Sequence, residues 1–208
     1  MEQKNETGIG EKVIFLDRDG TLNAEVNYLH RTEDLILLPG VIKALERFNK
    51  AGYMLVVVTN QAGVARGYYT EEEVRRLHEH MNAELQKHGA HVDKYYYCPH
   101  HPEHGVGAYK TDCNCRKPGI GMFEKAESEM PNGIDRAHSY MIGDKLIDTE
   151  AGRNFGVKSI LVGTGYGREL RSKQEQSGLI GIHGECLDES YDYYAENLMA
   201  AADFILKE

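Results

Sequence analysis

Two aspartates, Asp17 and Asp19, end the first apolar run of the chain and are its clearest candidates for chemistry. The run before them, Val13 to Leu16, has the β-branched and aromatic residues of a strand buried on both faces. In extended backbone, side chains two positions apart point the same way, so we expect the two carboxylates to lie close together. Their repulsion would be relieved by a divalent cation or a shared proton. The alternative for this short motif alone is an ordinary Asp-Gly turn.

A second polar cluster, Thr59-Asn60-Gln61, follows the apolar run Val56 to Val58. A hydroxyl, two amides and the backbone N–H groups of a turn suit an oxyanion or a phosphate group. Considered by itself, the cluster also fits a plain polar loop. If the two runs are parallel strands, this cluster lies at the same edge of the sheet as Asp17 and Asp19.

Two further clusters supply cations and carboxylates. Arg116 and Lys117 put two positive charges on one loop, and Asp144-Lys145 ends another apolar run, with Asp148 one helical turn further. A third carboxylate at a third strand end completes a magnesium site made of few carboxylates, water and phosphate oxygens. Singly, the cations fit a solvated pair and Asp144 fits a helix N-cap. Together, the four clusters predict one site that handles phosphate.

Apolar runs typical of buried strands alternate with helical patterns along the chain. This order predicts a mostly parallel sheet with helices on both faces, a Rossmann-like three-layer α/β fold. In such folds ligands bind beyond the carboxyl ends of the strands, where the four clusters lie. No segment between the clusters is long enough for a large mobile cap domain. We expect strands at 13–16, 53–58, 92–98, 139–142 and 159–162, and helices at 40–50, 70–88, 121–130, 148–155 and 191–206.

Length and charge limit the class of protein. The 208 residues suit one domain over residues 13–208, and the polar start, residues 1–12, is typical of a loose, disordered tail. The net charge of −9 argues against general nucleic-acid binding. No apolar stretch approaches the roughly 20 residues that span a bilayer, and the start lacks the pattern of a signal peptide. We therefore expect a cytoplasmic monomer with neither a membrane nor a nucleic-acid partner.

Three cysteines and a histidine form two paired spacings after the third predicted strand. Twelve residues separate the first pair, Cys98 and His100, from the second pair, Cys113 and Cys115. Three thiolates and an imidazole make a closed, structural zinc site. Loop 98–115 has no apolar run with which to pack, so zinc would fold it and position the cations that follow. The alternative is four unrelated residues in a His-rich loop; Cys186 is expected to be a lone thiol.

In chain order, the four clusters resemble the four motifs of the haloacid dehalogenase (HAD) superfamily of phosphotransferases, over roughly residues 13–167. The resemblance implies Asp17 as nucleophile, Asp19 as general acid and then base, and Thr59 and Lys117 as holders of the phosphoryl group. Asp19 must start protonated, so we expect burial and the neighbouring carboxylate to raise its pKa. The resemblance also implies Mg²⁺ on Asp17, the Asp19 backbone carbonyl and Asp144, with Lys145 adjacent and Asp148 in or just behind the metal shell.

The residue types agree with this chemistry. Phosphate-monoester hydrolysis is among the slowest uncatalysed reactions, and a carboxylate nucleophile divides it into two steps through an aspartyl-phosphate. An anion that attacks an anion needs strong local positive charge, which Mg²⁺ and Lys117 supply. The leaving alkoxide needs a proton, and a carboxyl group two residues from the nucleophile is well placed to donate it.

Within the superfamily, the cysteine loop resembles two groups, the heptose-bisphosphate phosphatases and the histidinol-phosphate phosphatases. Stretches 27–30, 59–67 and 163–167 are more similar to the first group, which removes the 7-phosphate of D-glycero-D-manno-heptose 1,7-bisphosphate. The alternatives are a histidinol-phosphate phosphatase, another small phosphomonoesterase, or a zinc-stabilised binding module, which the complete catalytic set disfavours. The resemblance implies that Arg116 grips the second phosphate, as its planar fork permits, and that the substrate is lined by Arg18, Glu25, Val26, Asn27, Tyr28, Asn60, Gln61 and Ala62.

Overall fold

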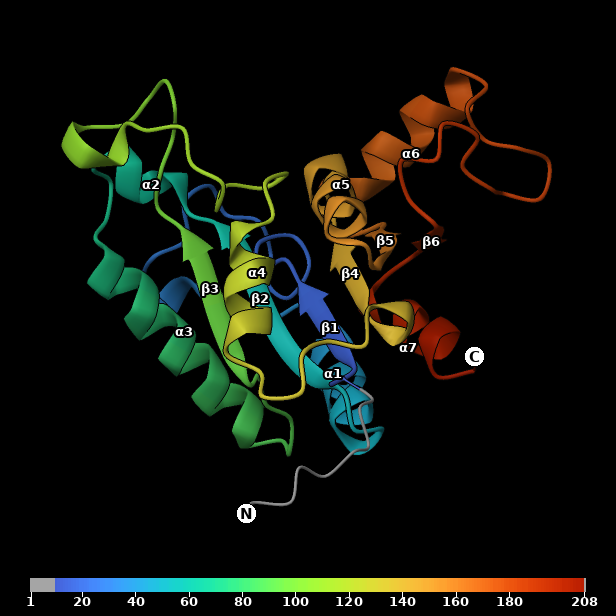
Figure 1. Cartoon of the computed structure of the whole chain (residues 1–208), viewed down its shortest axis with the longest axis horizontal. Helices are drawn as coiled ribbons and strands as arrows, with labels where there is room; N and C mark the ends of the chain where they lie inside the picture. The colour runs from blue at the N-terminus through green and yellow to red at the C-terminus, as the bar shows by residue number, and fades with distance from the viewer. Residues whose placement is uncertain (1–9, 208) are drawn as a thin grey trace, which may run out of the picture.

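A computed structural model describes residues 10–207 of the chain. Six parallel strands form one sheet in the order β3-β2-β1-β4-β5-β6 (Figure 1). The chain builds outward from β1 in one direction and then returns to its other side, so β1 lies at the switch point between β2 and β4. The strands are β1 (Val13–Leu16), β2 (Met54–Asn60), β3 (Lys94–Cys98), β4 (Tyr140–Gly143), β5 (Lys158–Val162) and β6 (Tyr193–Ala195).

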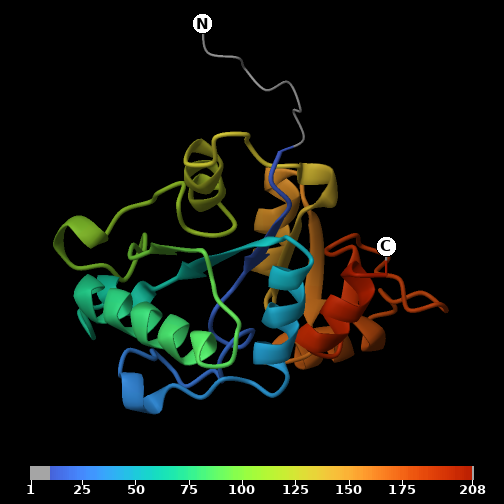
Figure 2. The same cartoon turned by 90° about the horizontal axis from the view of Figure 1, so that it is seen from below.

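Helices cover both faces of the sheet, which confirms the predicted three-layer α/β fold (Figure 2). Alternate residues of β1 point to opposite faces: Ile14 packs with α1, α3 and α7, whereas Phe15 packs with α4 and α5. Two cores on either side of one sheet explain why the strands are apolar without alternation. The helices are α1 (Val41–Lys50), α2 (Ala62–Ala65), α3 (Glu71–Gln86), α4 (Gly121–Ser128), α5 (Leu146–Phe155), α6 (Gly167–Gln176) and α7 (Leu198–Ile205).

Local signals explain several helix boundaries. The Thr70 hydroxyl accepts a hydrogen bond from the Glu73 N–H, and the Glu73 carboxylate accepts one from the Thr70 N–H, a capping box at the start of α3. Gly156 ends α5 in the left-handed conformation, at φ 91°. These two helices begin and end close to where the sequence predicts.

The predicted helix at 191–206 is wrong in its first half. Residues Tyr193–Ala195 form β6, which pairs with β5, and the helix begins only after the Asn197 N-cap. The aromatic pair in this segment favours a strand once a neighbouring strand edge is available. The prediction also missed two helices: the short α2, and α6, for which the sequence gives no clear apolar pattern because few of its residues are buried.

The predicted loose tail, residues 1–12, lies mostly outside the described residues. Glu11 and Lys12 belong to the folded body, since Glu11 pairs with Ile134 and the Lys12 carbonyl accepts from the Met54 N–H at 2.9 Å. Among residues 10–207, no helix is both long and apolar enough to cross a membrane.

Candidate active site

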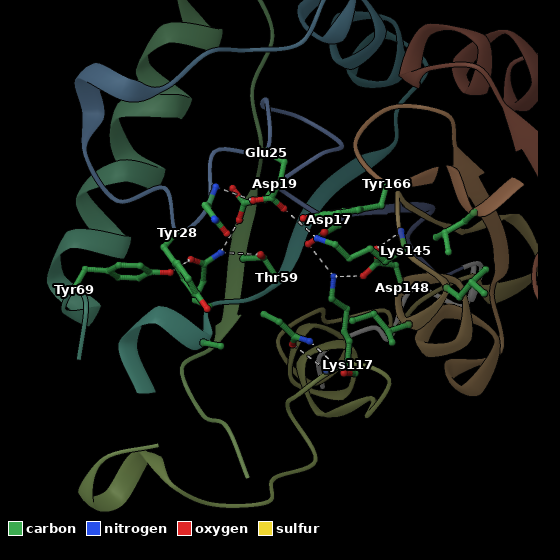
Figure 3. A pocket seen from close by; sticks show the side chains of 17 residues that line it. Asp17, Asp19, Glu25, Tyr28, Thr59, Tyr69, Lys117, Lys145, Asp148 and Tyr166 are labelled. Atoms are coloured by element: carbon green, nitrogen blue, oxygen red, sulfur yellow. Dashed lines mark hydrogen bonds and ion pairs between the residues drawn. The ribbon is translucent and has the colours of Figure 1, made fainter. Parts of the chain in front are cut away.

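The carboxyl ends of the central strands bring the sequence clusters together around one cavity of about 520 Å³ (Figure 3). Asp17 stands at the end of β1, where its N–H still donates to the Ile142 carbonyl of β4 at 2.9 Å. Thr59 lies in β2, which runs two residues beyond its predicted end because β3 pairs with it as far as Asn60. The predicted site residues that line the cavity are Asp17, Asp19, Glu25, Asn27, Tyr28, Thr59, Asn60, Gln61, Ala62, Lys117, Lys145 and Asp148.

Four predicted site residues lie away from the cavity wall. Arg18 is fully buried behind Asp19, and Asp144 is fully buried beneath the site. Val26 is 40% exposed and borders a separate surface hollow. Arg116 donates from Nη1 to the His100 carbonyl at 3.3 Å, so the structure holds it against the cysteine loop.

Five residues of the wall were missed by sequence reasoning: Tyr69, Leu146, Ile147, Tyr166 and Leu170. Leu170 belongs to α6, the helix that the sequence pattern did not indicate. Tyr69 stands two residues before α3, and its hydroxyl donates to Gln61 Oε1 at 2.8 Å. The Gly-Tyr-Gly signal around Tyr166 was visible in the sequence, but only the tertiary fold places that loop beside Asp144.

Lys117 forms the positive centre of the site. Its Nζ lies 2.9 Å from Asp17 Oδ1 and 2.7 Å from Asp148 Oδ1, and all three side chains are almost fully buried. Burial lowers the pKa of Lys117, but the two carboxylates outweigh burial and raise it. Asn60 fixes the backbone here, because its side chain both donates to the Lys117 carbonyl and accepts from the Lys117 N–H.

Three carboxylates meet beside this lysine. One oxygen each of Asp17, Asp144 and Asp148 lie within 4.8 Å of one another. Burial, together with the charge of Asp17, raises the pKa of Asp144 to about 7 and that of Asp148 to about 6. Lys145, with Nζ 3.9 Å from Asp144 Oδ1, partly offsets this repulsion.

The cluster of Asp17, Asp144 and Asp148 has the chemistry of a site for a divalent cation. Within the described part of the chain, Asp144 Oδ1 is buried and accepts no hydrogen bond. Two glycines approach the other oxygen: a Cβ at Gly20 would lie 2.3 Å from Asp144 Oδ2, and one at Gly165 would lie 2.1 Å from it. Both glycines also have positive φ. A buried oxygen that accepts no hydrogen bond, beside two other carboxylates, is the donor set of a small hard cation.

Asp19 does not have the raised pKa that the sequence predicts. Burial raises its pKa, but the Arg18 guanidinium 2.8 Å away and hydrogen bonds from Asn23 and Gln61 lower it below its usual value. The prediction assumed extended backbone as far as Asp19. Instead the chain turns after Asp17, because the Arg18 carbonyl accepts from the N–H groups of residues 21–23. The Arg18 side chain therefore lies on the same side as Asp19.

Gln61 links this acid to the phosphate-binding hydroxyl predicted at Thr59. Its Nε2 donates to Asp19 Oδ2 and to Thr59 Oγ1, both at 3.0 Å. Because the amide uses both of its N–H donors in this way, it sets the relative position of the two groups.

The cysteine loop brings its four predicted zinc ligands together. The ligand atoms of Cys98, His100, Cys113 and Cys115 all lie within 4.8 Å of one another. The three Sγ–Sγ distances are 3.0, 3.1 and 3.4 Å, somewhat shorter than the edge of about 3.8 Å expected for a tetrahedron with Zn–S bonds of about 2.3 Å. Hydrogen bonding with Cys98 and Cys113 lowers the pKa of Cys115 to about 5. The donor set fits zinc.

Comparison with known proteins agrees with the resemblance of the four clusters to the HAD motifs. A HAD-hydrolase-like family model matches residues 114–180. D-glycero-β-D-manno-heptose-1,7-bisphosphate 7-phosphatase of Haemophilus ducreyi is 48% identical over 159 residues, 76% of this chain and 86% of the relative. The Escherichia coli K12 protein of the same name is 46% identical over 154 residues, 73% of this chain and 79% of that protein. The chain belongs to this family of HAD-like phosphatases.

Solved structures of the family share the fold. The D,D-heptose 1,7-bisphosphate phosphatase of B. bronchiseptica, complexed with magnesium and phosphate, superposes with a TM-score of 0.76 at 31% identity, covering 94% of this chain and 98% of that one. The Burkholderia thailandensis enzyme gives a TM-score of 0.63 at 25% identity, covering 95% of this chain and 100% of the other. HAD phosphatases use Mg²⁺, and the family member with bound magnesium provides a solved example.

Proposed function

We propose that this protein is a Mg²⁺-dependent phosphatase that removes the 7-phosphate of D-glycero-D-manno-heptose 1,7-bisphosphate through an aspartyl-phosphate. One observation carries the reaction type: a buried carboxylate at the floor of a cavity, Asp17, has a lysine at 2.9 Å and two further carboxylates within 4.8 Å. The sugar substrate is supported by the names of relatives that are 44–49% identical to the chain.

Asp17 is the proposed nucleophile. Its Oδ1 is held by Lys117, whose positive charge also attracts the incoming phosphate and offsets the repulsion between two anions. The Thr59 hydroxyl, on the adjacent strand, accepts from Gln61 and can donate its own proton to a phosphoryl oxygen. Mg²⁺, held by Asp17, the Asp19 backbone carbonyl and Asp144, with Asp148 just behind, would neutralise charge on the transferred group.

Asp19 is the proposed acid in the first step and the base in the second. Its pairing with Arg18 keeps it ionised in the free enzyme, so the required proton is supplied with the substrate. A phosphate monoester has a second pKa of about 6, so near neutral pH part of the substrate is the monoanion that carries this proton. The incoming negative charge raises the pKa of Asp19, which favours transfer of the proton to the carboxylate. Asp19 then donates it to the leaving alkoxide.

The cavity wall supports a sugar bisphosphate. Its volume of about 520 Å³ is within the usual range for small-molecule sites. Glu25, Asn27 and Asn60 supply polar groups for sugar hydroxyls, while Tyr28 and Tyr166 supply aromatic surface. The second phosphate is proposed to bind Arg116, which directly precedes Lys117 and would have to release its 3.3 Å hydrogen bond to the His100 carbonyl to turn towards the cavity.

The remaining proposals concern the bound zinc, the oligomeric state and the cellular location of the protein. Zinc on Cys98, His100, Cys113 and Cys115 is proposed as structural, because four protein ligands leave no open position. A monomer in the cytoplasm remains our expectation from the sequence.

Phosphate release from a substrate panel tests the proposal. The panel contains both anomers of heptose 1,7-bisphosphate, histidinol phosphate and fructose 1,6-bisphosphate, with Mg²⁺ present and the Asp17→Asn variant as control. ³¹P NMR would identify which phosphate leaves. We expect the highest kcat/KM for a heptose bisphosphate, with loss of the 7-phosphate. A higher value for histidinol phosphate would overturn the substrate, and no Mg²⁺-dependent release from any compound would overturn the reaction.

A further inference from the structure

A buried histidine outside the cavity contacts the guanidinium of Arg18, the residue that pairs with the proposed acid, Asp19. His78 lies in the middle of α3, is 4% exposed, and has Nε2 3.3 Å from Nη1 of Arg18. Its ring stacks on Tyr95 of β3, with centroids 4.6 Å apart and planes 20° from parallel. Neither His78 nor its helix contributes to the wall of the substrate cavity.

The contact between Arg18 and His78 shows which nitrogen of the imidazole ring carries the proton. A guanidinium has donors only, so His78 Nε2 must accept the hydrogen bond and the ring must be neutral, with its proton on Nδ1. Burial and the charge of Arg18 lower the pKa of His78 to about 3, in agreement with this assignment. His78 is therefore a fixed acceptor throughout the physiological pH range.

Arg18 lies between His78 and Asp19 and contacts both side chains. The opposite side of the guanidinium binds the carboxylate, with Nε 3.2 Å from Oδ1 and Nη2 2.8 Å from Oδ2. A guanidinium is planar and rigid, so holding Nη1 on one side fixes the direction of the fork on the other. Within the described residues, His78 is the one side chain with which Nη1 is seen to bond.

We propose that His78 is a positioning residue for protonation of the leaving group: through Arg18 it holds the Asp19 carboxyl where the sugar oxygen departs. The inference rests on the proposed function. In the first step the Asp17 oxygen forms a bond to phosphorus, the bond between phosphorus and the sugar oxygen breaks, and the proton of Asp19 passes to that oxygen. Asp19 becomes a carboxylate, which Arg18 is placed to stabilise.

A matched pair of variants separates this role from a structural one. His78→Gln keeps an acceptor near the position of Nε2, whereas His78→Met has similar length and no comparable acceptor. A second cavity of about 280 Å³ beside the ring, between α3 and β3, gives both side chains room. His80→Met, two residues along the same helix at a partly exposed site, is the control for a methionine in α3.

The measurement is kcat/KM for heptose 1,7-bisphosphate and for p-nitrophenyl phosphate, in the full-length Mg²⁺-loaded protein. The value of kcat/KM reports the steps up to formation of the aspartyl-phosphate. The nitrophenolate leaving group departs without a proton, so p-nitrophenyl phosphate does not need the general acid. We expect His78→Met to lose roughly tenfold or more on the sugar phosphate and less than about threefold on p-nitrophenyl phosphate. His78→Gln and His80→Met should keep the wild-type ratio between the two substrates.

Equal losses of His78→Met on both substrates, or no loss on either, would overturn the proposal. If His78→Met fails to fold, as judged by its thermal melt, His78→Asn replaces it, because its amide is polar but too short to reach Arg18. An unchanged substrate ratio in His78→Asn then overturns the proposal. Failure of the proposed function is separate, since it would appear as a wild-type protein that does not release phosphate from the sugar.

Discussion

Acid should destabilise this protein partly through one buried imidazole. His78 has a pKa of about 3 in the folded state, against an ordinary value of 6.5. The folded state therefore binds fewer protons at this site than the unfolded chain does. Above pH 6.5 the site has no effect on stability, and as the pH falls from 6.5 towards 3 the unfolded state gains protons that the folded state cannot accept.

The loss in free energy of unfolding depends on how far the pH lies below the pKa of His78 in the unfolded chain. Each pH unit below 6.5 costs about 1.4 kcal/mol, so at pH 5 the site lowers the free energy of unfolding by about 2 kcal/mol relative to pH 7. The loss should continue down to about pH 3, where the folded state also begins to bind the proton. Replacing the ring by an uncharged amide removes this term and leaves the other titrating groups unchanged.

Urea denaturation of wild type and His78→Gln at pH 7 and pH 5 measures the effect. We expect the wild type to lose about 2 kcal/mol more than the variant over this interval, because the contributions of all other groups cancel in the difference. Equal losses in the two proteins would refute the reasoning, since they would mean that the folded state accepts a proton at His78 and that this ring is not the fixed acceptor of Arg18.

Three further predictions concern the site itself. Asp17→Asn should abolish phosphate release while the far-ultraviolet circular dichroism and thermal melt stay near wild type; substantial turnover by this variant would exclude Asp17 as nucleophile. Arg116→Ala should lower kcat/KM for a bisphosphate far more than for a monophosphate, and equal losses on the two would remove its proposed contact with the second phosphate. Elemental analysis should find one zinc per chain in protein purified without chelator. Cys113→Ser should lower that content and destabilise the loop, and zinc-free wild type of unchanged stability would contradict the structural role.

Much of the site could be predicted because its residues stand at the ends of strands. Parallel strands have their carboxyl ends at one edge, so recognising Asp17, Thr59 and Asp144 after apolar runs is enough to predict that they converge. The cysteine and histidine ligands were visible in the same way, since their paired spacings within one short loop are local features.

Features that depend on a neighbour from elsewhere in the chain were not predicted. Tyr193–Ala195 became a strand because β5 offered it an edge, and α6 buries too few residues to show a helical pattern. Arg116 belongs to the predicted cationic loop, yet a carbonyl of the cysteine loop holds its side chain away from the cavity wall.

The sequence by itself determined the candidate residues for the chemistry and the edge of the sheet at which they meet, because residue type and strand periodicity are local properties. Only the tertiary structure decided the charge state of Asp19. Its pKa depends on burial, on a turn that brings the Arg18 guanidinium to the carboxylate, and on hydrogen bonds from Asn23 and from Gln61, 42 positions along the chain. A pKa is set by the atoms within a few ångströms, and those atoms come from segments that only folding places together.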